Sequence, residues 1–250
     1  MADLNSHATL RVADLLHYSR SASINELCLP HALSPLAMAQ LGDDVSRERR
    51  LVRGERLFRQ GHGMHALYCV IDGMLKTVIV DDEGREQITG FHFRTELVGL
   101  DALPRREHVC MATAITTTRV RVLPLHRLQD AMQQAPALRD ALVALVGRAL
   151  AQHEQLLLVV NQRRSTERVA ILMLSFACRL GRNGSVARTF RLSMSRAEIA
   201  NYLGLAQETV SRAFRRLEKA GILEVQGKQL QIVDAALLIQ CAVAGWSEHD

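Results

Sequence analysis

The chain has 250 residues, of which 48% are hydrophobic and 23% charged, and its formal net charge is +5 at pH 7. This length allows two domains with separate cores, and the composition excludes a disordered polymer. No apolar run reaches the ~18–20 residues that span a membrane, and the first 20 residues lack the pattern of a signal peptide, so we expect a cytoplasmic protein. Five cysteines without Cys-x-x-Cys spacing argue against a disulfide framework or a tetrathiolate zinc site.

Positive charge is concentrated in the C-terminal third. Residues 161–231 hold 13 Lys and Arg against 5 Glu and no Asp, so the remainder of the chain is slightly acidic. A basic segment on an acidic body is typical of a nucleic-acid-binding module. A solvated basic face is the alternative that charge alone leaves open.

Residues 52–127 predict a compact antiparallel β-roll. Short apolar segments such as "HALYCVI", "MLKTVIV", "EQITGFHF" and "TRVRVLPL" alternate with glycine-containing turns. The tetrapeptide "DDEG" before an alternating segment predicts a hairpin. Strands of this length at regular spacing favour a closed roll, which we place at residues 31–131 after an N-terminal extension of residues 1–30.

A long helix is predicted to follow over residues 132–163. One apolar stripe has the 3-4 spacing of a dimer seam and consists of Val143, Val146, Leu150, His153, Leu157 and Val160. A neighbouring stripe consists of Leu142, Leu145, Ala149, Leu156 and Val159. Two stripes predict packing on the helix's own domain and on a second copy. A single wide core-facing stripe is the alternative.

The segment "SMSRAEIANYLGLAQETVSRAFRRLEKAGILEVQGKQLQIVD" predicts a winged helix-turn-helix. Ser195 and Glu198 form a capping box that begins one helix, and Gly204 ends it. A second helix runs over about 207–219, and a hairpin turning at Gly227 forms the wing. We place this domain at residues 164–238 and a C-terminal tail at 239–250. The predicted fold class is therefore α+β.

The second helix presents a polar face suited to reading DNA in the major groove. Arg212 can donate two hydrogen bonds to guanine, Glu208 can accept one from a base amino group, and Ser211 can contact a base or a phosphate. Phosphate contacts position such a helix without reading sequence. The candidates for phosphate contact are Ser195, Gln207, Thr209, Arg215, Arg216 and Lys228.

The order of roll, long helix and winged helix-turn-helix resembles the CRP/FNR family of bacterial transcription regulators. The resemblance is carried by "ELCLP", "LYCVIDGMLKT", "EGREQITGFH", "LVGLDAL", "ERVAILML" and "IANYLGLAQETVSR", and it is closest to the fumarate and nitrate reduction branch. It implies a homodimer on a TTGAT-N4-ATCAA palindrome, with Glu208, Ser211 and Arg212 as the reading triad. Gln207 stands where the cyclic-AMP branch has an additional Arg. The resemblance also implies contact with RNA polymerase around Gly84 and Arg85.

The same resemblance bears on cofactors. Where the cyclic-AMP branch holds the cyclic phosphate with an Arg-Ser pair, this chain has "EHVCMA", so we expect no cyclic nucleotide. The fumarate and nitrate branch holds an oxygen-labile 4Fe–4S cluster with four cysteines. Of these positions only Cys28 is retained, since Ser19, Ala22 and Arg121 occupy the others. Cys69 and Cys110 do not complete the set, so we expect neither cluster nor metal.

The seam supports DNA binding without a cluster. Relatives carry an acid in the seam whose repulsion keeps the cluster-free form monomeric. Here the matching residue is His153, and a histidine carries little charge at pH 7. The sequence therefore predicts a homodimer that forms without a cluster.

Two alternatives remain open from the sequence. A regulator of the same family could sense its signal through haem bound by a histidine, or through thiol oxidation at Cys28 or Cys110. A more distant alternative is a cupin-like metalloenzyme with His62, His65 and His92 as ligands. Because no nucleophile and base pattern accompanies them, we expect no enzyme.

Overall fold

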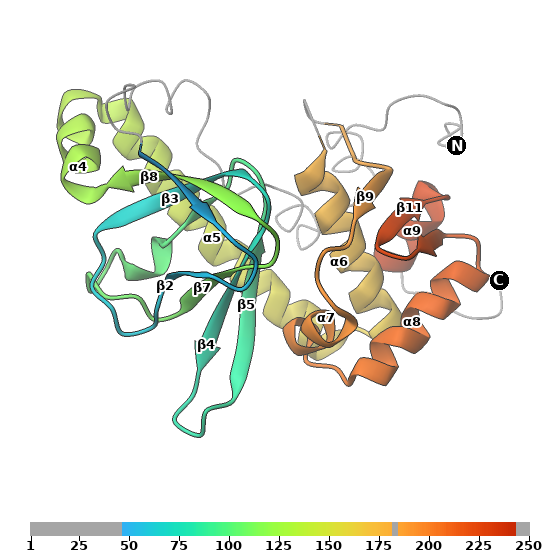
Figure 1. Cartoon of the computed structure of the whole chain (residues 1–250). Helices are drawn as coiled ribbons and strands as arrows, with labels where there is room; N and C mark the ends of the chain where they lie inside the picture. The colour runs from blue at the N-terminus through green and yellow to red at the C-terminus, as the bar shows by residue number, and fades with distance from the viewer. Residues whose placement is uncertain (1–46, 182–184, 244–250) are drawn as a thin grey trace. The chain divides into compact units, whose positions relative to one another are not determined.

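The computed structural model describes residues 47–181 and 185–243. Its two compact units divide at residue 150, within the long helix. The first unit contains the β-roll and the second contains the helix-turn-helix (Figure 1). Cys28, Ser19 and Ala22, on which part of the cluster argument depends, lie outside the described residues.

The first unit is an antiparallel β-roll, as predicted. Its strands pair in the orders β1-β8-β3-β6 and β2-β7-β4-β5. The tetrapeptide "DDEG" forms the turn of the β4–β5 hairpin, which projects from the roll in Figure 1. The strands within the described part of this unit are β1 (Arg47–Leu51), β2 (Arg56–Phe58), β3 (Ala66–Asp72), β4 (Leu75–Val80), β5 (Glu86–His92), β6 (Leu97–Val98), β7 (Met111–Ala114) and β8 (Thr118–Pro124).

Alternating side chains place apolar residues on both faces of the β1-β8-β3-β6 sheet. On one face, Leu51, Val70 and Val120 join the core enclosed by the two sheets. On the other face, Leu67 and Leu123 pack with residues of the helices that follow the roll. Burial of both faces explains why the strands read as near-continuous apolar runs.

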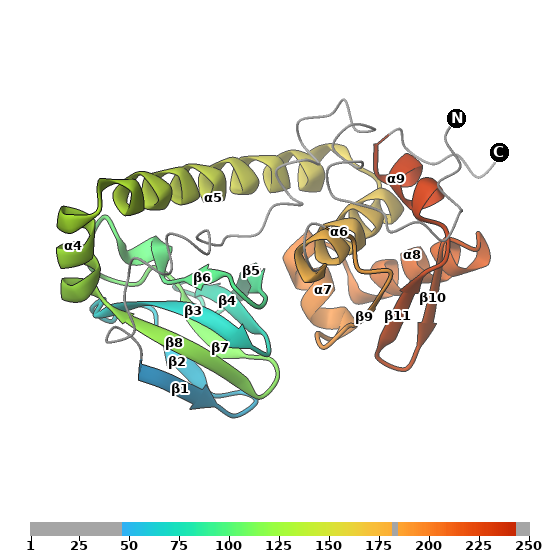
Figure 2. The ribbon, with the colours of Figure 1, turned by 90° about the horizontal axis from the view of Figure 1, so that it is seen from above.

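The long helix begins later than predicted. Helix α4 (Leu125–Gln134) ends before Ala135, and α5 (Pro136–Gln162) begins with a proline, which is well suited to a first helical position. The predicted range of 132–163 therefore includes the end of α4 and the break. Figure 2 shows α5 as the long helix that follows α4.

The two apolar stripes of α5 have different environments. In the second stripe Leu142 and Leu145 are buried against the roll. In the predicted dimer seam Val143, Leu150 and Leu157 are 67%, 61% and 63% exposed. By length and composition alone residues 136–161 could span a membrane, but the packing on the roll accounts for one side of this helix.

The second unit is a winged helix-turn-helix, as predicted. Strands pair in the order β10-β11-β9 to form the wing. The predicted boundary between residues 238 and 239 is wrong, because it falls inside α9, where Ile239 and Cys241 are buried. The elements after α5 are α6 (Ser165–Leu180), β9 (Thr189–Arg191), α7 (Arg196–Leu203), α8 (Gln207–Lys219), β10 (Leu223–Gln226), β11 (Gln229–Ile232) and α9 (Ala235–Val243).

Candidate nucleic-acid interface

Local sequence signals set the starts and ends of α7 (Arg196–Leu203) and α8 (Gln207–Lys219). We refer to this helix-turn-helix pair as the reading head. Ser195 caps α7 by accepting a hydrogen bond from the Glu198 amide, and the Glu198 carboxylate accepts one in return from the Ser195 amide. Gly204 ends α7 with φ 62°, a left-handed conformation that glycine adopts without strain. Helix α8 then begins at Gln207, and its apolar side is buried through Val210, Phe214 and Leu217.

The opposite side of α8 carries the predicted base-reading residues. Glu208 and Arg212 are exposed and Ser211 is partly exposed. The Arg212 guanidinium donates to Thr209 Oγ1 at 3.3 Å, a contact within the same helix that leaves most of its donors open to solvent. Among the described residues, the Glu208 and Arg215 side chains make no hydrogen bond or ion pair. This face therefore offers donors and an acceptor that the protein itself does not use.

The predicted phosphate-contact residues lie around that face but are not equivalent. Gln207, Arg215, Arg216 and Lys228 are exposed, Lys228 in the β10–β11 turn of the wing. Ser195 differs from them, because its hydroxyl and amide both donate to the Glu198 carboxylate. A phosphate would have to compete with this capping box for the Ser195 donors.

Arg196 is a residue that the sequence did not reveal. Its guanidinium carbon lies 3.3 Å from the centroid of the Phe214 ring in α8. Burial lowers the pKa of Arg196, and the nearby Glu218 carboxylate partly offsets this effect. A cation in the first turn of a helix is disfavoured by the helix dipole, so Arg196 needs such partners. The contact fixes the start of α7 against the apolar side of α8.

Glu218 also connects α8 to the wing. Its carboxylate accepts a hydrogen bond from the Val225 amide in β10 at 3.2 Å. Arg196, Phe214, Glu218 and Val225 thus form a continuous set of contacts from α7 through α8 to the wing. This set holds the polar face of α8 and the Lys228 turn in one arrangement.

The predicted dimer-seam residues form an uncovered row along α5. Val143, Val146, Leu150, His153 and Leu157 are exposed, and Val160 is partly exposed. Large apolar side chains at this spacing on a solvent-facing helix are typical of an interface that lacks its partner.

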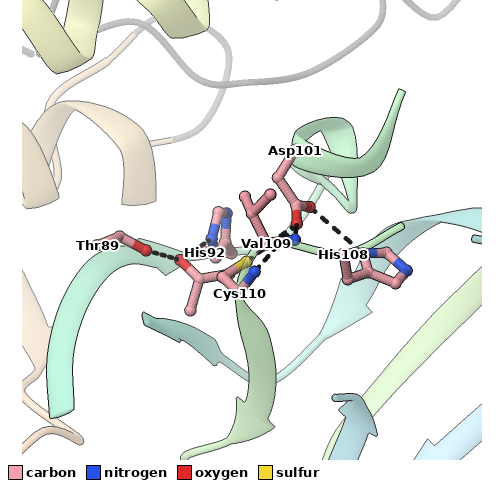
Figure 3. A network of polar contacts seen from close by, with 7 residues as sticks. Thr89, His92, Asp101, His108, Val109 and Cys110 are labelled. Carbon is pink, nitrogen blue, oxygen red and sulfur yellow. Dashed lines mark hydrogen bonds and ion pairs between the residues drawn. The ribbon is translucent and has the colours of Figure 1, made fainter. Parts of the chain in front are cut away.

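A partly buried polar network centred on Asp101 involves the roll segment "EHVCMA" (Figure 3). The Asp101 carboxylate accepts from the Val109 amide at 3.0 Å and from the Cys110 amide at 3.4 Å, and it lies 3.5 Å from His108 Nδ1. Burial raises the pKa of Asp101, but contacts from His108 and Cys110 outweigh it, so the pKa lies below its ordinary value. The Val109 and Cys110 amides therefore already donate to a carboxylate of the protein itself.

The candidate metal ligands do not converge. His92 pairs through Nε2 with Thr77 Oγ1 at 3.1 Å, while His62 and His65 are exposed on the loop that precedes β3. In the described part of the chain no three His, Cys, Asp or Glu side chains are grouped as metal ligands. The cupin-like alternative has no site among these residues.

Arg121 and Cys69 are cross-strand partners in the β3–β8 pair. Cys69 is buried and burial raises its pKa, with an opposing effect from the Arg121 charge.

The predicted polymerase-contact residues Gly84 and Arg85 lie in the β4–β5 turn. There the Arg85 guanidinium pairs with Asp81 at 2.7 Å and with Glu83 at 2.9 Å.

Comparison with known proteins places this geometry in a family. Residues 48–135 match the cyclic nucleotide-binding domain, and residues 167–241 match the Crp-like helix-turn-helix domain. The chain is 41% identical to the transcriptional activator protein Anr of Pseudomonas protegens over 230 residues, which cover 92% of this chain and 93% of that protein. The chain belongs to the CRP/FNR family.

Further similar proteins agree with this assignment. The fumarate and nitrate reduction regulatory protein of Shigella dysenteriae is 34% identical over 225 residues, 90% of each chain. FixK2 from Bradyrhizobium japonicum has a similar structure, with a TM-score of 0.71 and 30% identity over 78% of this chain and 96% of that one. As a CRP/FNR member the chain is a DNA-binding transcription regulator, and α7 and α8 lie within the matched helix-turn-helix domain.

Proposed function

We propose that the protein is a cytoplasmic, homodimeric transcription activator that binds a TTGAT-N4-ATCAA palindrome without a cluster or a cyclic nucleotide. The observation that carries the proposal is the outer face of α8, where Glu208, Ser211 and Arg212 are accessible on a helix whose other side is buried. Arg212 suits guanine and Glu208 suits a base amino group. The name of the Anr relative supports activation as the regulatory outcome.

The homodimer is supported by the uncovered seam of α5. A second copy of the same helix would bury these apolar side chains in a symmetric contact. A two-fold protein suits a palindromic site, because each recognition helix then meets one half-site. His153 introduces no acidic repulsion into that seam.

Loss of the cluster is supported by the surroundings of Arg121. Arg121 is the cross-strand partner of Cys69, and its charge acts on that thiol, so a residue that cannot ligate iron stands at the position that the resemblance assigns to the fourth cluster cysteine. We infer that this family member does not sense oxygen through a cluster.

Loss of cyclic-nucleotide binding is supported by the Asp101 network. A phosphate bound at this segment would meet the Asp101 carboxylate, which already accepts from the Val109 and Cys110 amides, and the two anions would repel. Thiol sensing at Cys110 is disfavoured as well. Burial, the Asp101 charge and the hydrogen bond to Asp101 all raise the pKa of Cys110, so the reactive thiolate is scarce.

We also propose that the β4–β5 turn contacts RNA polymerase. The turn projects from the roll, and Arg85 is exposed although it pairs with Asp81 and Glu83. A partner there would meet a zwitterionic surface rather than a free cation.

The test of base reading is Arg212→Ala, titrated against the palindrome and a scrambled duplex at one salt concentration. We expect a loss of about 1–3 kcal/mol on the palindrome and a much smaller loss on the scrambled duplex. Lys219→Ala is the matched control, since it removes an exposed charge from the other end of α8. Equal losses on both duplexes would contradict base reading by Arg212.

A further inference from the structure

A cavity of about 470 Å³ opens at the surface of the roll, around the start of β2 and the turn that follows it. Its size falls within the range of about 300–1,000 Å³ that holds small ligands. Neither the reading head, the dimer seam nor the "EHVCMA" segment contributes to it. The side chains that matter for its chemistry are Arg49, Glu55, Arg56, Phe58, Arg59 and His62.

The lining is cationic beyond what its own acid can neutralise. Glu55 pairs with Arg49 at 3.0 Å and also accepts from the Val52 amide at 3.0 Å. The Val52 and Arg49 hydrogen bonds lower the pKa of Glu55, so this acid stays ionised and neutralises Arg49. Arg56 and Arg59 are left, and in the part of the chain that the structure describes their side chains make no hydrogen bond or ion pair.

The backbone that carries these cations is already fixed. Arg49 donates to the carbonyls of Arg56 and Leu57 at 3.3 and 3.2 Å, which ties β1 to β2. The Gln60 side chain both donates to and accepts from the backbone of Val80, at 3.0 and 2.8 Å.

The turn after β2 is held from within and from a neighbouring segment. The His62 amide donates to the Arg59 carbonyl at 3.3 Å, and the Gly61 amide donates to the His108 carbonyl at 2.8 Å. A ligand would therefore meet cations on a backbone that needs no ordering, which lowers the cost of binding.

We propose that this cavity binds a phosphate group, presented by a phosphate ester or a polyphosphate. Guanidinium groups donate paired hydrogen bonds that match phosphate oxygens, and Arg56 and Arg59 supply two such groups beside the His62 imidazole. A multiply charged anion suits two open cations better than a single carboxylate does. The site would give this regulator an anion-binding input separate from the segment where cyclic nucleotides bind in relatives.

The test is isothermal titration calorimetry of the full chain with inorganic pyrophosphate. In Arg56→Gln/Arg59→Gln we expect binding weakened roughly tenfold or more, because two sets of charge-assisted hydrogen bonds are removed. The matched control is Arg50→Gln/Arg53→Gln, which removes the same charge from exposed arginines outside the cavity and should leave binding nearly unchanged. Thermal denaturation verifies that both double variants fold.

Equal losses in the two double variants would assign the binding to net charge and overturn the proposal. Absence of pyrophosphate binding at millimolar concentration would overturn it too. Because the titration contains no DNA, either failure is distinct from a failure of the proposed DNA binding.

A second experiment distinguishes DNA phosphates from a free phosphate compound as the ligand. The affinity of both double variants is measured on two duplexes, one limited to the palindrome and one with long flanks. A loss in Arg56→Gln/Arg59→Gln that is confined to the flanked duplex would assign the cavity to DNA phosphates outside the palindrome. Equal affinity of both double variants on both duplexes would assign it to a free phosphate compound.

Discussion

The outer face of α8 and the 101–110 segment of the roll are both polar, but they satisfy their polar groups in opposite ways. On α8, Glu208 is exposed without a partner among the described residues, and Arg212 contacts only its own helix. In the roll, the Asp101 carboxylate takes up the donors of residues 108–110. Polar groups left open on α8 are available to a partner, whereas those around Asp101 are already bonded to one another.

The largest effect is expected on the open seam of α5. Leu150→Glu places a charge on each copy in the seam, so the dimer should dissociate and affinity for the palindrome should fall about 100-fold as the two half-sites bind independently. The unfolding temperature of the single chain should hardly change, since Leu150 is 61% exposed.

Sedimentation velocity and DNA titration check this prediction. Ala144→Glu, at an exposed position outside both stripes, adds the same charge and should remain dimeric. A dimeric Leu150→Glu protein with full affinity would show that the seam is not the interface.

A substitution in the Asp101 network of the roll should change the stability of the protein and leave its DNA affinity unchanged. Asp101→Asn should reduce the free energy of unfolding by about 1–3 kcal/mol, because the Val109 and Cys110 amides lose a charged acceptor, while DNA affinity stays the same. Because the folded-state pKa of Asp101 is lowered, its stabilisation is complete above the ordinary carboxyl pKa of about 4 and is lost as the pH falls through the folded-state value.

Urea denaturation at neutral and acidic pH measures both effects. The difference between wild type and Asp101→Asn should shrink in acid, and the exposed Asp130→Asn should match wild type throughout. A variant that loses DNA affinity but no stability would break the contrast between the open and closed sites.

Arg196 provides a third case. Its guanidinium contacts the Phe214 ring, although the residue lies in the same helix-turn-helix as the polar face of α8. Arg196→Met should lower the free energy of unfolding by about 1 kcal/mol through loss of the cation–π contact. The slope of log affinity against log salt should not change, since no phosphate contact is lost. Arg215→Met should do the reverse, with unchanged stability and a slope reduced by about 1. A reduced slope in Arg196→Met would make it a phosphate contact rather than a positioning residue.

The reading head was predictable from sequence because its signals are local. Ser195 and Glu198 are three residues apart, and Gly204 marks the end of α7 without reference to any distant contact. The two stripes of α5 were likewise visible as spacing, and burial of Leu142 and Leu145 confirms which stripe packs on the roll.

The missed features depend on contacts between distant residues. Ile239 and Cys241 were assigned to a tail because their burial depends on α6, which lies far earlier in the chain. The Asp101 network forms only when the roll closes and brings residue 101 to the start of β7. For Arg196 the sequence offers one local indication, a cation in the first turn of α7. Its partner Phe214 lies on the next helix, so the contact itself could not be predicted.

The most direct test of the account is DNA binding by aerobically purified, metal-free protein at one stated salt concentration. The account predicts nanomolar affinity for the TTGAT-N4-ATCAA duplex and much weaker binding to a scrambled control. Weak binding of equal strength on both duplexes would contradict it, because the reading head would then require a signal or cofactor before it could recognise its site.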